Sequence, residues 1–459
     1  MDLVWNEKHG AIFSLLIERL QNANIRCFVM RNYKGLPDKN ESKDVDVIVE
    51  PGKVSEARKI LLEVYKQNNL EYYSEAVFGK VHCMLGMDTK NTFSIHIDLI
   101  EGYLSKGYEI FTFDELYEHT IVYKNFRVMD EFFEGVMLYI YKQFGYKKPQ
   151  LKTQYQELIA HTYSQYSNEF KGLLVKLVGN DFAEETCKFI ESRDFERVVK
   201  NTPKFTKKLR AYVWKKHPMH TLKNICLFLT QKFNRTILSY RKYARVIAVL
   251  APDGTGKTTF LDKLNEAMSF YYVNLIEDNR FHIYHFRPTI LPNLGELGEK
   301  AGVMKQDRDF TDPHRSKPDN FFGSLIRISY YVCDYIIGWQ KCVRSDVQFD
   351  KYTVFDRYSY DFIVDPLRTK LNLPISVRKF FVRLTPQPDI VYILHAQPEV
   401  IYSRKKELSL DEIRRQNGEY HKLAKSNSKR FVVLNAERPV SDMVEEAVQS
   451  LMKKYAKKL

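Results

Sequence analysis

The strongest constraint on the fold is a segment in which an apolar stretch, a glycine-containing turn and a helix-forming stretch follow one another directly, ARVIAVLAPDGTGKTTFLDKL (244–264). The eight residues Ala251–Thr258 fit the pattern GxxxxGK[ST], with alanine in the first position. The apolar stretch lacks alternation, as expected of a strand that is covered on both faces. A strand, a tight turn and a helix in this order predict an α/β unit built around a parallel sheet.

The chemistry of this turn accounts for its residue types. Backbone N–H groups of the turn and of the helix N-terminus can surround phosphate oxygens. The Lys257 ammonium can reach the β- and γ-phosphates, and the Thr258 hydroxyl can ligate Mg²⁺. The alternative is an ordinary glycine-containing turn. We expect ATP and Mg²⁺ to bind here, and the residues expected to hold them are Asp253, Gly254, Thr255, Gly256, Lys257, Thr258 and Thr259.

Four further apolar stretches follow, with helical patterns between them, which is typical of βαβ units. The five expected strands are 245–250, 281–286, 352–356, 389–395 and 430–435. Ligands of such a sheet bind beyond the carboxyl ends of its strands, and Asp356 and Arg357 come at that end of one strand. We expect Asp356 to order a metal ion or water and Arg357 to bind a second phosphate. The alternative for this pair is an ion-paired strand end.

Four motifs resemble thymidylate kinases in order and spacing: the glycine-containing turn, DRY at 356–358, PDIVYILHAQPEVIYSR at 388–404 and VVLNAERPVSDMVEEA at 432–447. The resemblance covers about 246–455 and implies a P-loop domain of the nucleoside-monophosphate kinase type, with a five-stranded parallel core. It also implies that Asp253 lies near the acceptor, that Arg357 binds the acceptor phosphate and that Arg404 lies at a lid. The residues expected to act in catalysis are Lys257, Asp356, Arg357 and Arg404.

The expected lid is basic. Phosphoryl transfer depends mostly on positioning and on neutralisation of charge, so a mobile arm of cations suits this chemistry. The alternative is a basic helix whose charges are simply solvated. The residues concerned are Arg404, Lys405, Lys406, Arg414 and Arg415.

Two segments, 285–323 and 364–374, have no obvious counterpart in housekeeping thymidylate kinases. They lie where an acceptor pocket is built, and they bring Arg287, His314, Asp365 and Arg368. The acceptor is therefore left open between a nucleotide such as thymidylate and a sugar, a polyol or a sugar phosphate. The residues expected to contact the acceptor are Asp253, Arg287, Arg357 and Arg368.

The N-terminal part carries three aspartates in strand-like segments. KDVDVIVE (43–50) alternates strictly and puts Asp44 and Asp46 on one face, while TFSIHIDLI (92–100) puts Asp98 on the corresponding face of another strand. Three carboxylates arranged in this way can hold two Mg²⁺ ions for in-line nucleotidyl transfer. The alternative is a set of polar residues on the wet face of a half-buried strand.

This pattern resembles the nucleotidyltransferase fold over about 10–160, which implies an α+β domain for this part of the chain. Members of that fold usually carry a Gly-Ser turn that binds the triphosphate. Here Arg31-Asn32-Tyr33 stands in its place. We therefore expect a metal site on these three carboxylates, while the missing Gly-Ser turn counts against transferase activity.

The formal net charge of +14 comes largely from one segment, because fourteen Lys or Arg and no Asp or Glu lie between 197 and 252. Its apolar residues have helical spacing, which favours a helical linker with its charge facing solvent. Contact with an anionic membrane or a nucleic acid is the alternative. The expected parts of the chain are a nucleotidyltransferase-like domain at 1–125, its helical extension at 126–200, a basic helical connector at 201–244 and the P-loop domain at 245–459.

Six scattered cysteines without a CxxC pair point to a reducing compartment and against structural zinc. No signal peptide is recognisable, and no apolar run reaches the roughly 20 residues that span a bilayer. We expect a cytoplasmic ATP-dependent kinase for a small molecule, with a second, nucleotidyltransferase activity; a homodimer is left open. The alternatives are a nucleotide-binding regulator with degenerate catalytic domains and a nucleotidyltransferase that modifies a protein or RNA.

Overall fold

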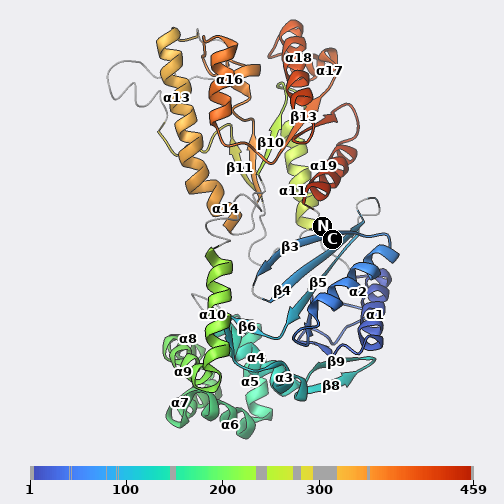
Figure 1. The fold of residues 1–459 in the computed structure, drawn as a ribbon, viewed down its shortest axis with the longest axis vertical. Helices are drawn as coiled ribbons and strands as arrows, with labels where there is room; N and C mark the ends of the chain where they lie inside the picture. The colour runs from blue at the N-terminus through green and yellow to red at the C-terminus, as the bar shows by residue number, and fades with distance from the viewer. Residues whose placement is uncertain are drawn as a thin grey trace. The chain divides into compact units, whose positions relative to one another are not determined.

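The computed structural model describes residues 5–40, 42, 44–78, 80–88, 90, 93–144, 151–233, 246–271, 281–292, 318–348 and 352–455. The chain forms two compact units, Asp2–Phe233 and Asn234–Tyr455, here called the first and the second unit. Each unit contains its own large sheet (Figure 1). In the described part of the chain, every helix is too short or too polar to cross a membrane.

The second unit is built on five parallel strands in the order β11-β12-β10-β13-β14. They are β10 (Val246–Leu250), β11 (Phe281–His285), β12 (Tyr352–Asp356), β13 (Ile390–His395) and β14 (Phe431–Asn435). The prediction of a five-stranded parallel sheet is confirmed. All five residues of β10 are fully buried, which explains why this strand shows no alternation of apolar and polar residues.

Helices cover this sheet. They are α11 (Lys257–Tyr271), α13 (Phe321–Gly338), α14 (Arg344–Gln348), α15 (Asp361–Val364), α16 (Ile375–Leu384), α17 (Pro398–Arg404), α18 (Leu410–Ser426) and α19 (Val440–Tyr455). A π-helical turn, Trp339–Val343, joins α13 to α14. Residues of β10, β12 and β13 share an apolar core with α13. On β13 the Tyr392 hydroxyl donates a hydrogen bond of 2.8 Å to the Ala447 carbonyl, which fixes α19.

The first unit contains a mixed sheet of seven strands in the order β3-β4-β5-β2-β1-β9-β8. Its strands are β1 (Cys27–Val29), β2 (Val45–Val49), β3 (Glu71–Phe78), β4 (Val81–Asp88), β5 (Phe93–Glu101), β8 (Thr120–Tyr123) and β9 (Phe126–Met129). One face packs against α1 (Glu7–Asn22) and α2 (Val54–Gln67). Alternate residues of β2 (Val45, Val47 and Val49) lie in that core, so their aspartate neighbours lie on the other face.

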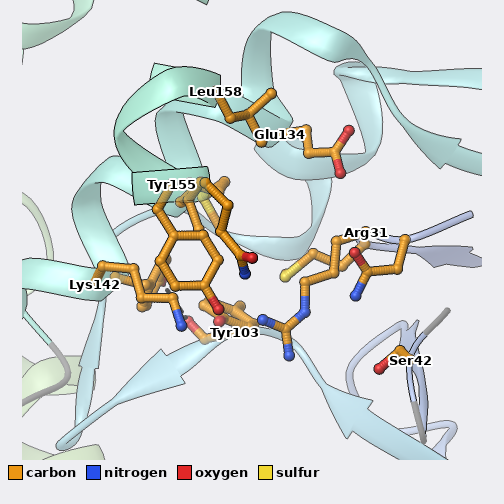
Figure 2. Close-up of a pocket in the computed structure, with 13 residues that line it drawn as sticks. Arg31, Ser42, Tyr103, Glu134, Lys142, Tyr155 and Leu158 are labelled. Atoms are coloured by element: carbon orange, nitrogen blue, oxygen red, sulfur yellow. Dashed lines mark hydrogen bonds between the residues drawn. The ribbon is translucent and has the colours of Figure 1, made fainter. Parts of the chain in front are cut away.

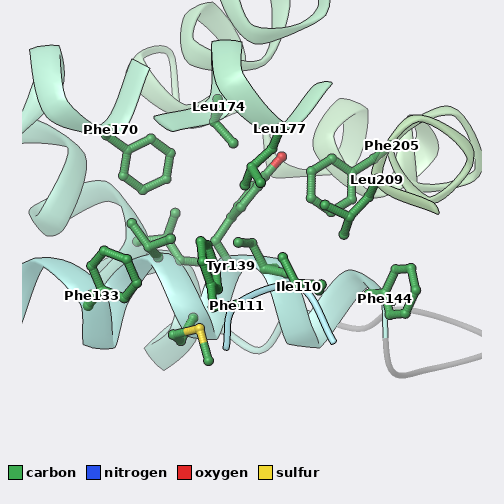
Figure 3. Packing of buried hydrophobic residues seen from close by; sticks show 14 of the residues in the cluster. Ile110, Phe111, Phe133, Tyr139, Phe144, Phe170, Leu174, Leu177, Phe205 and Leu209 are labelled. Carbon is green, nitrogen blue, oxygen red and sulfur yellow. The ribbon is translucent and has the colours of Figure 1, made fainter. Parts of the chain in front are cut away.

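The other face of this sheet leads into a helical core. Ile48 and Ile100 belong to it, together with the aromatic residues shown in Figure 3, where Phe133, Phe170 and Phe205 surround Tyr139. The elements of this part are β6 (Leu104–Ser105), β7 (Tyr108–Glu109), α3 (Phe113–Glu118), α4 (Glu131–Phe144), α5 (Thr153–Gln165), α6 (Ser167–Val178), α7 (Asn180–Glu191), α8 (Phe195–Lys200), α9 (Thr202–Lys216) and α10 (Pro218–Phe233).

The segment expected to be a connector is helical, and its first helix belongs to the core of the first unit. Phe205, Leu209 and Val213 on α9 are buried in the helical core. Their spacing of four residues places them on one face of the helix, and the basic residues take the others. Residues 234–244 of the expected connector lie outside the described residues.

Candidate functional site

The turn after β10 has the backbone conformation that its glycines allow. Gly254 and Gly256 have φ of +88° and +98°, a region that residues with a Cβ atom rarely adopt. A Cβ atom on Gly254 would also lie 2.8 Å from Cβ of Lys405. Ala251, which replaces the usual first glycine, has no positive φ. The turn therefore tolerates alanine at that position, and α11 begins at Lys257 with its free N–H groups directed at the turn.

Three cations surround the carboxylate of Asp253 in this turn. The guanidinium groups of Arg357 and Arg368 each form an ion pair with it, and Nζ of Lys257 lies 3.4 Å from its Oδ1. Burial alone would raise the pKa of Asp253, but the charges of Arg357, Lys257 and Arg368 outweigh this effect and lower it well below the usual range. We call Asp253, Lys257, Arg357 and Arg368 the Asp253 cluster.

Arg357 is held from several sides. It follows β12 directly, and its backbone N–H donates to the Val249 carbonyl of β10 at 3.0 Å. Its φ of +76° is unfavourable for a residue with a side chain, and such strain is typical of functional positions. Its guanidinium also donates to Asp361, at 3.0 Å, and Asp361 is fully buried. The Tyr420 hydroxyl donates to the same carboxylate at 3.3 Å, so two elements fix the arginine.

Asp356 ends β12 at the same edge of the sheet, since it pairs in register with Val249 near the end of β10. One of its oxygens, Oδ2, lies 3.3 Å from Nδ1 of His285 at the end of β11. The other, Oδ1, is buried and has no hydrogen-bond partner among the described residues. A buried carboxylate oxygen without a partner fits a hard cation or its water. Asp356 and the exposed hydroxyl of Thr258 are thus the residues that would hold Mg²⁺.

The first unit contains a second candidate site, made of three carboxylates. Asp46 on β2 pairs directly with Asp98 on β5. Asp44, Asp46 and Asp98 each offer one oxygen, and these oxygens lie within 4.8 Å of one another. Asp98 is only 4% exposed, so it does not belong to a wet strand face. We call these three residues the carboxylate cluster.

The electrostatics of the carboxylate cluster favour a bound cation. Burial raises the pKa of Asp46 to about 6, and the charges of Asp44 and Asp98 add to this although Arg31 opposes it. Nε of Arg31 lies 2.9 Å from Oδ2 of Asp46. The Arg31 guanidinium does not neutralise three carboxylates, and a divalent cation beside it would. The donor set of hard oxygens therefore fits Mg²⁺.

Figure 2 shows residues that line a cavity of about 370 Å³, which Arg31 connects to the carboxylate cluster. Arg31 links the two, because it lines the cavity and binds Asp46. Across the cavity, Nζ of Lys142 lies 4.3 Å from the centre of the Tyr155 ring. In Figure 2 the Lys142 ammonium, the Tyr155 hydroxyl and the Arg31 guanidinium converge on one space. The cavity is thus lined by the cations Arg31 and Lys142 beside Glu134 and Tyr155, and it can take a ligand that carries an anionic group.

No model of a known protein family matches the sequence, and no curated protein matches it. Among solved structures, thymidylate kinase from Ehrlichia chaffeensis is similar, with 18% sequence identity and a TM-score of 0.30. The match covers 46% of this chain and 98% of that chain.

The structure brings some predicted residues together and separates others. Asp253, Lys257, Arg357 and Arg368 form one cluster. Arg287 instead forms a buried ion pair with Asp334, with 2.8 Å between Nη1 and Oδ2, and none of its contacts reaches the Asp253 cluster within the described ranges. This arrangement gives Arg287 a structural role in holding the segment after β11 against α13.

Arg404 and the other cations of the expected lid have local partners. The Arg404 guanidinium donates to the Ala436 carbonyl at 3.3 Å. Lys405 pairs with Glu407, Arg414 with Glu399 and Arg415 with Glu412. The start of this segment nevertheless lies on the glycine turn, since Cβ of Lys405 is the atom closest to a Cβ placed on Gly254. His314 lies outside the described residues.

Several residues of the two sites could not be recognised in the sequence. Asp361 on the short helix α15 accepts from Arg357, and Tyr420 on the long helix α18 donates to Asp361. Neither residue belongs to a motif of its own. Lys142 and Tyr155 lie on the amphipathic helices α4 and α5, where a lysine or tyrosine carries no signal. The alternation in TFSIHIDLI puts His96 on the same strand face as Asp98, and Nε2 of His96 lies 2.9 Å from Oδ1 of Asp98. This shared face was the signal by which the sequence could have indicated the contact.

Proposed function

We propose that the second unit is an ATP-dependent phosphotransferase that uses Mg²⁺ and acts on a small molecule that already carries a phosphate. The observation that supports this best is the Asp253 cluster. It puts two arginines beside the glycine turn, at the carboxyl edge of a parallel sheet. A nucleotide-binding turn alone needs no such pair, whereas the phosphate of an acceptor does.

The chain's residues would divide the work as follows. The N–H groups of the turn and the Lys257 ammonium bind the β- and γ-phosphates of ATP. Thr258 and Asp356 would hold Mg²⁺, which would supply neutralisation of charge at these phosphates. Arg357 presents its guanidinium to the acceptor phosphate from a fixed position. Because little covalent chemistry falls to the protein in phosphoryl transfer, this positioning supplies most of the catalysis.

Asp253 has a specific part in this scheme. Its carboxylate holds Arg357 and Arg368 in place when no acceptor is bound. An acceptor phosphate carries more negative charge and can draw both arginines by bidentate hydrogen bonds. Arg368 comes from the segment 364–374, which is this chain's own, so we assign to it the choice between a nucleoside monophosphate and a sugar phosphate.

An acceptor screen tests this proposal. The full chain is incubated with ATP·Mg²⁺ and a panel of nucleoside monophosphates, sugars and sugar phosphates, and mass spectrometry detects products heavier by one phosphoryl group. Lys257→Ala should abolish the product, whereas Lys263→Ala on the exposed side of the same helix should not. ATP turnover that no acceptor changes would refute the transferase and favour a nucleotide-binding regulator.

We propose a second activity for the first unit, a Mg²⁺-dependent nucleotidyl transfer at the carboxylate cluster. The supporting observation is the adjoining cavity, which Arg31 connects to Asp46. The three carboxylates would hold the metal ions, and one of them would accept the proton of the attacking hydroxyl while pyrophosphate leaves the nucleoside triphosphate. Asp44→Asn/Asp46→Asn should remove nucleotidyl adducts from the same screen and leave the kinase product intact. Asp114→Asn, an exposed aspartate of the same unit, is the matched control, and adducts that survive the double change would refute the metal site.

A further inference from the structure

Helix α10 buries polar side chains and exposes apolar ones, which is the reverse of an ordinary surface helix. The side chains that it buries are Thr221 and Asn224, which are 1% and 4% exposed. Its inner side lies close to the strand pair β6–β7, since a Cβ atom on Gly107 would be 2.8 Å from Cα of Ile225. An amphipathic helix on a protein surface normally does the opposite and turns its apolar side inward.

The outer side of α10 carries a continuous apolar stripe. Met219, Leu222, Leu229 and Phe233 are between 45% and 76% exposed, and the exposed Cys226 lies among them. The five residues follow a spacing of three, four, three and four, which confines them to an arc of roughly 80° on the helix. We call these five residues the α10 stripe. Contiguous exposed apolar surface of this kind marks an interaction site.

The charge around the α10 stripe identifies the kind of surface that would cover it. Helices α9 and α10 contain no Asp or Glu over residues 202–233, and their Lys and Arg residues are Lys204, Lys207, Lys208, Arg210, Lys215, Lys216, Lys223 and Lys232. Of these, Lys216 pairs with Glu115 and Arg210 packs over the Tyr108 ring within the first unit. Lys223 and Lys232 lie on α10 itself and are exposed. A partner must therefore offer negative charge next to an apolar layer.

We propose that α10 binds the surface of an anionic lipid membrane, with the α10 stripe inserted among the acyl chains and the lysines at the headgroups. Exposed leucine, methionine and phenylalanine on one arc, flanked by lysine, are the features of a helix that lies in a membrane interface. A nucleic acid would use the lysines but would leave the aliphatic side chains of the stripe without a partner. An anionic lipid surface offers partners to both the lysines and the aliphatic side chains.

Vesicle sedimentation with the full chain tests this proposal. We expect binding to vesicles of phosphatidylcholine and phosphatidylglycerol that weakens with salt, and binding to phosphatidylcholine alone that is at least about tenfold weaker. Leu222→Glu/Leu229→Glu should lower vesicle binding by about tenfold or more. Ile121→Glu/Val122→Glu, which changes two exposed apolar residues on β8 of the same unit, should leave it unchanged.

Three results would overturn the proposal. The first is an absence of binding to anionic vesicles. The second is binding to anionic vesicles that the Leu222/Leu229 change leaves intact. The third is a clear drop in the melting temperature of the Leu222/Leu229 variant but not of the Ile121/Val122 variant, because a stripe that another part of this chain covers would be destabilised by two glutamates.

Discussion

In the second unit, three cations surround the carboxylate of Asp253, and two of them are also paired with Asp361 and Asp365. In the first unit, three carboxylates lie together and Arg31 pairs with one of them, Asp46. The Asp253 cluster thus has guanidinium groups that can turn from a carboxylate to an anion, and the carboxylate cluster has negative charge to offer a cation. Both lie in the protein partly buried, where unbalanced charge is costly. On this basis we propose phosphate as the ligand of the Asp253 cluster and a divalent metal as the ligand of the carboxylate cluster.

The two clusters also differ in how they are fixed. Strand register alone brings Asp46 against Asp98, so the carboxylate cluster needs little beyond the sheet. The Asp253 cluster depends on side chains from distant loops and helices, and on an arginine with an unfavourable φ. We expect mutations in the second unit to affect stability and activity together, and mutations in the first to affect mainly ligand binding.

The largest effect is expected from Arg357→Ala. It leaves the buried Asp361 without its guanidinium, and removal of one partner of a buried ion pair costs roughly 3–5 kcal/mol. Kinase turnover should fall by about 10³-fold or more, as for other arginines that stabilise phosphoryl transfer. Urea unfolding and product formation measure the two losses. Arg383→Ala, an exposed arginine of α16, is the control, and an unchanged unfolding free energy for Arg357→Ala would show that Asp361 does not depend on it.

A smaller loss is expected from Gly254→Ala. The φ of +88° and the 2.8 Å approach of Lys405 make a Cβ atom unfavourable, by roughly 1–3 kcal/mol. Calorimetry should show a lower melting temperature and weaker ATP binding. Gly418→Ala is the control because a Cβ atom there meets nothing within 4 Å. Equal behaviour of the two variants would mean that the glycine turn is not constrained as described.

We expect Mg²⁺ added without nucleotide to stabilise the carboxylate cluster and not the Asp253 cluster. At ten times its dissociation constant, Mg²⁺ should stabilise the first unit by about 1.4 kcal/mol. The effect should disappear in Asp98→Asn. Hydrogen exchange with and without Mg²⁺ locates the protection, which we expect in β2 and β5 and not in α11. Protection that survives Asp98→Asn would contradict a metal site on the carboxylate cluster.

The mildest expected effect is a dependence of the unfolding free energy on pH that is caused by the titration of Asp253. The folded-state pKa of Asp253 is lowered by its cations against the opposing effect of burial. Its contribution to stability is therefore complete above the unfolded pKa of about 3.9 and is lost as pH falls through the folded value. The difference in unfolding free energy between wild type and Asp253→Asn should be constant from neutral to weakly acidic pH and should shrink in strong acid. A difference that grows on acidification would reverse the sign of our interpretation.

The sequence predicted those features that local patterns encode. Five apolar stretches predicted the positions of the five parallel strands. Alternation with a period of two predicted that Asp44, Asp46 and Asp98 lie on one face of a sheet. Contacts between distant segments were not encoded locally. Arg287 and Arg368 looked equivalent in the sequence, yet one pairs with Asp334 and the other with Asp253. The many basic residues of α9 likewise led us to predict a connector, although Phe205, Leu209 and Val213 form an apolar face that packs into the first unit.

Phosphorus NMR of the reaction mixture tests the central claim most directly, because it shows where the γ-phosphate of ATP goes. With the phosphorylated acceptor found in the screen, the account predicts a new P–O–P linkage on that acceptor. The signal should be lost in Lys257→Ala and kept in Lys263→Ala. Release of inorganic phosphate alone, at a rate that the acceptor does not change, would contradict phosphoryl transfer at the Asp253 cluster.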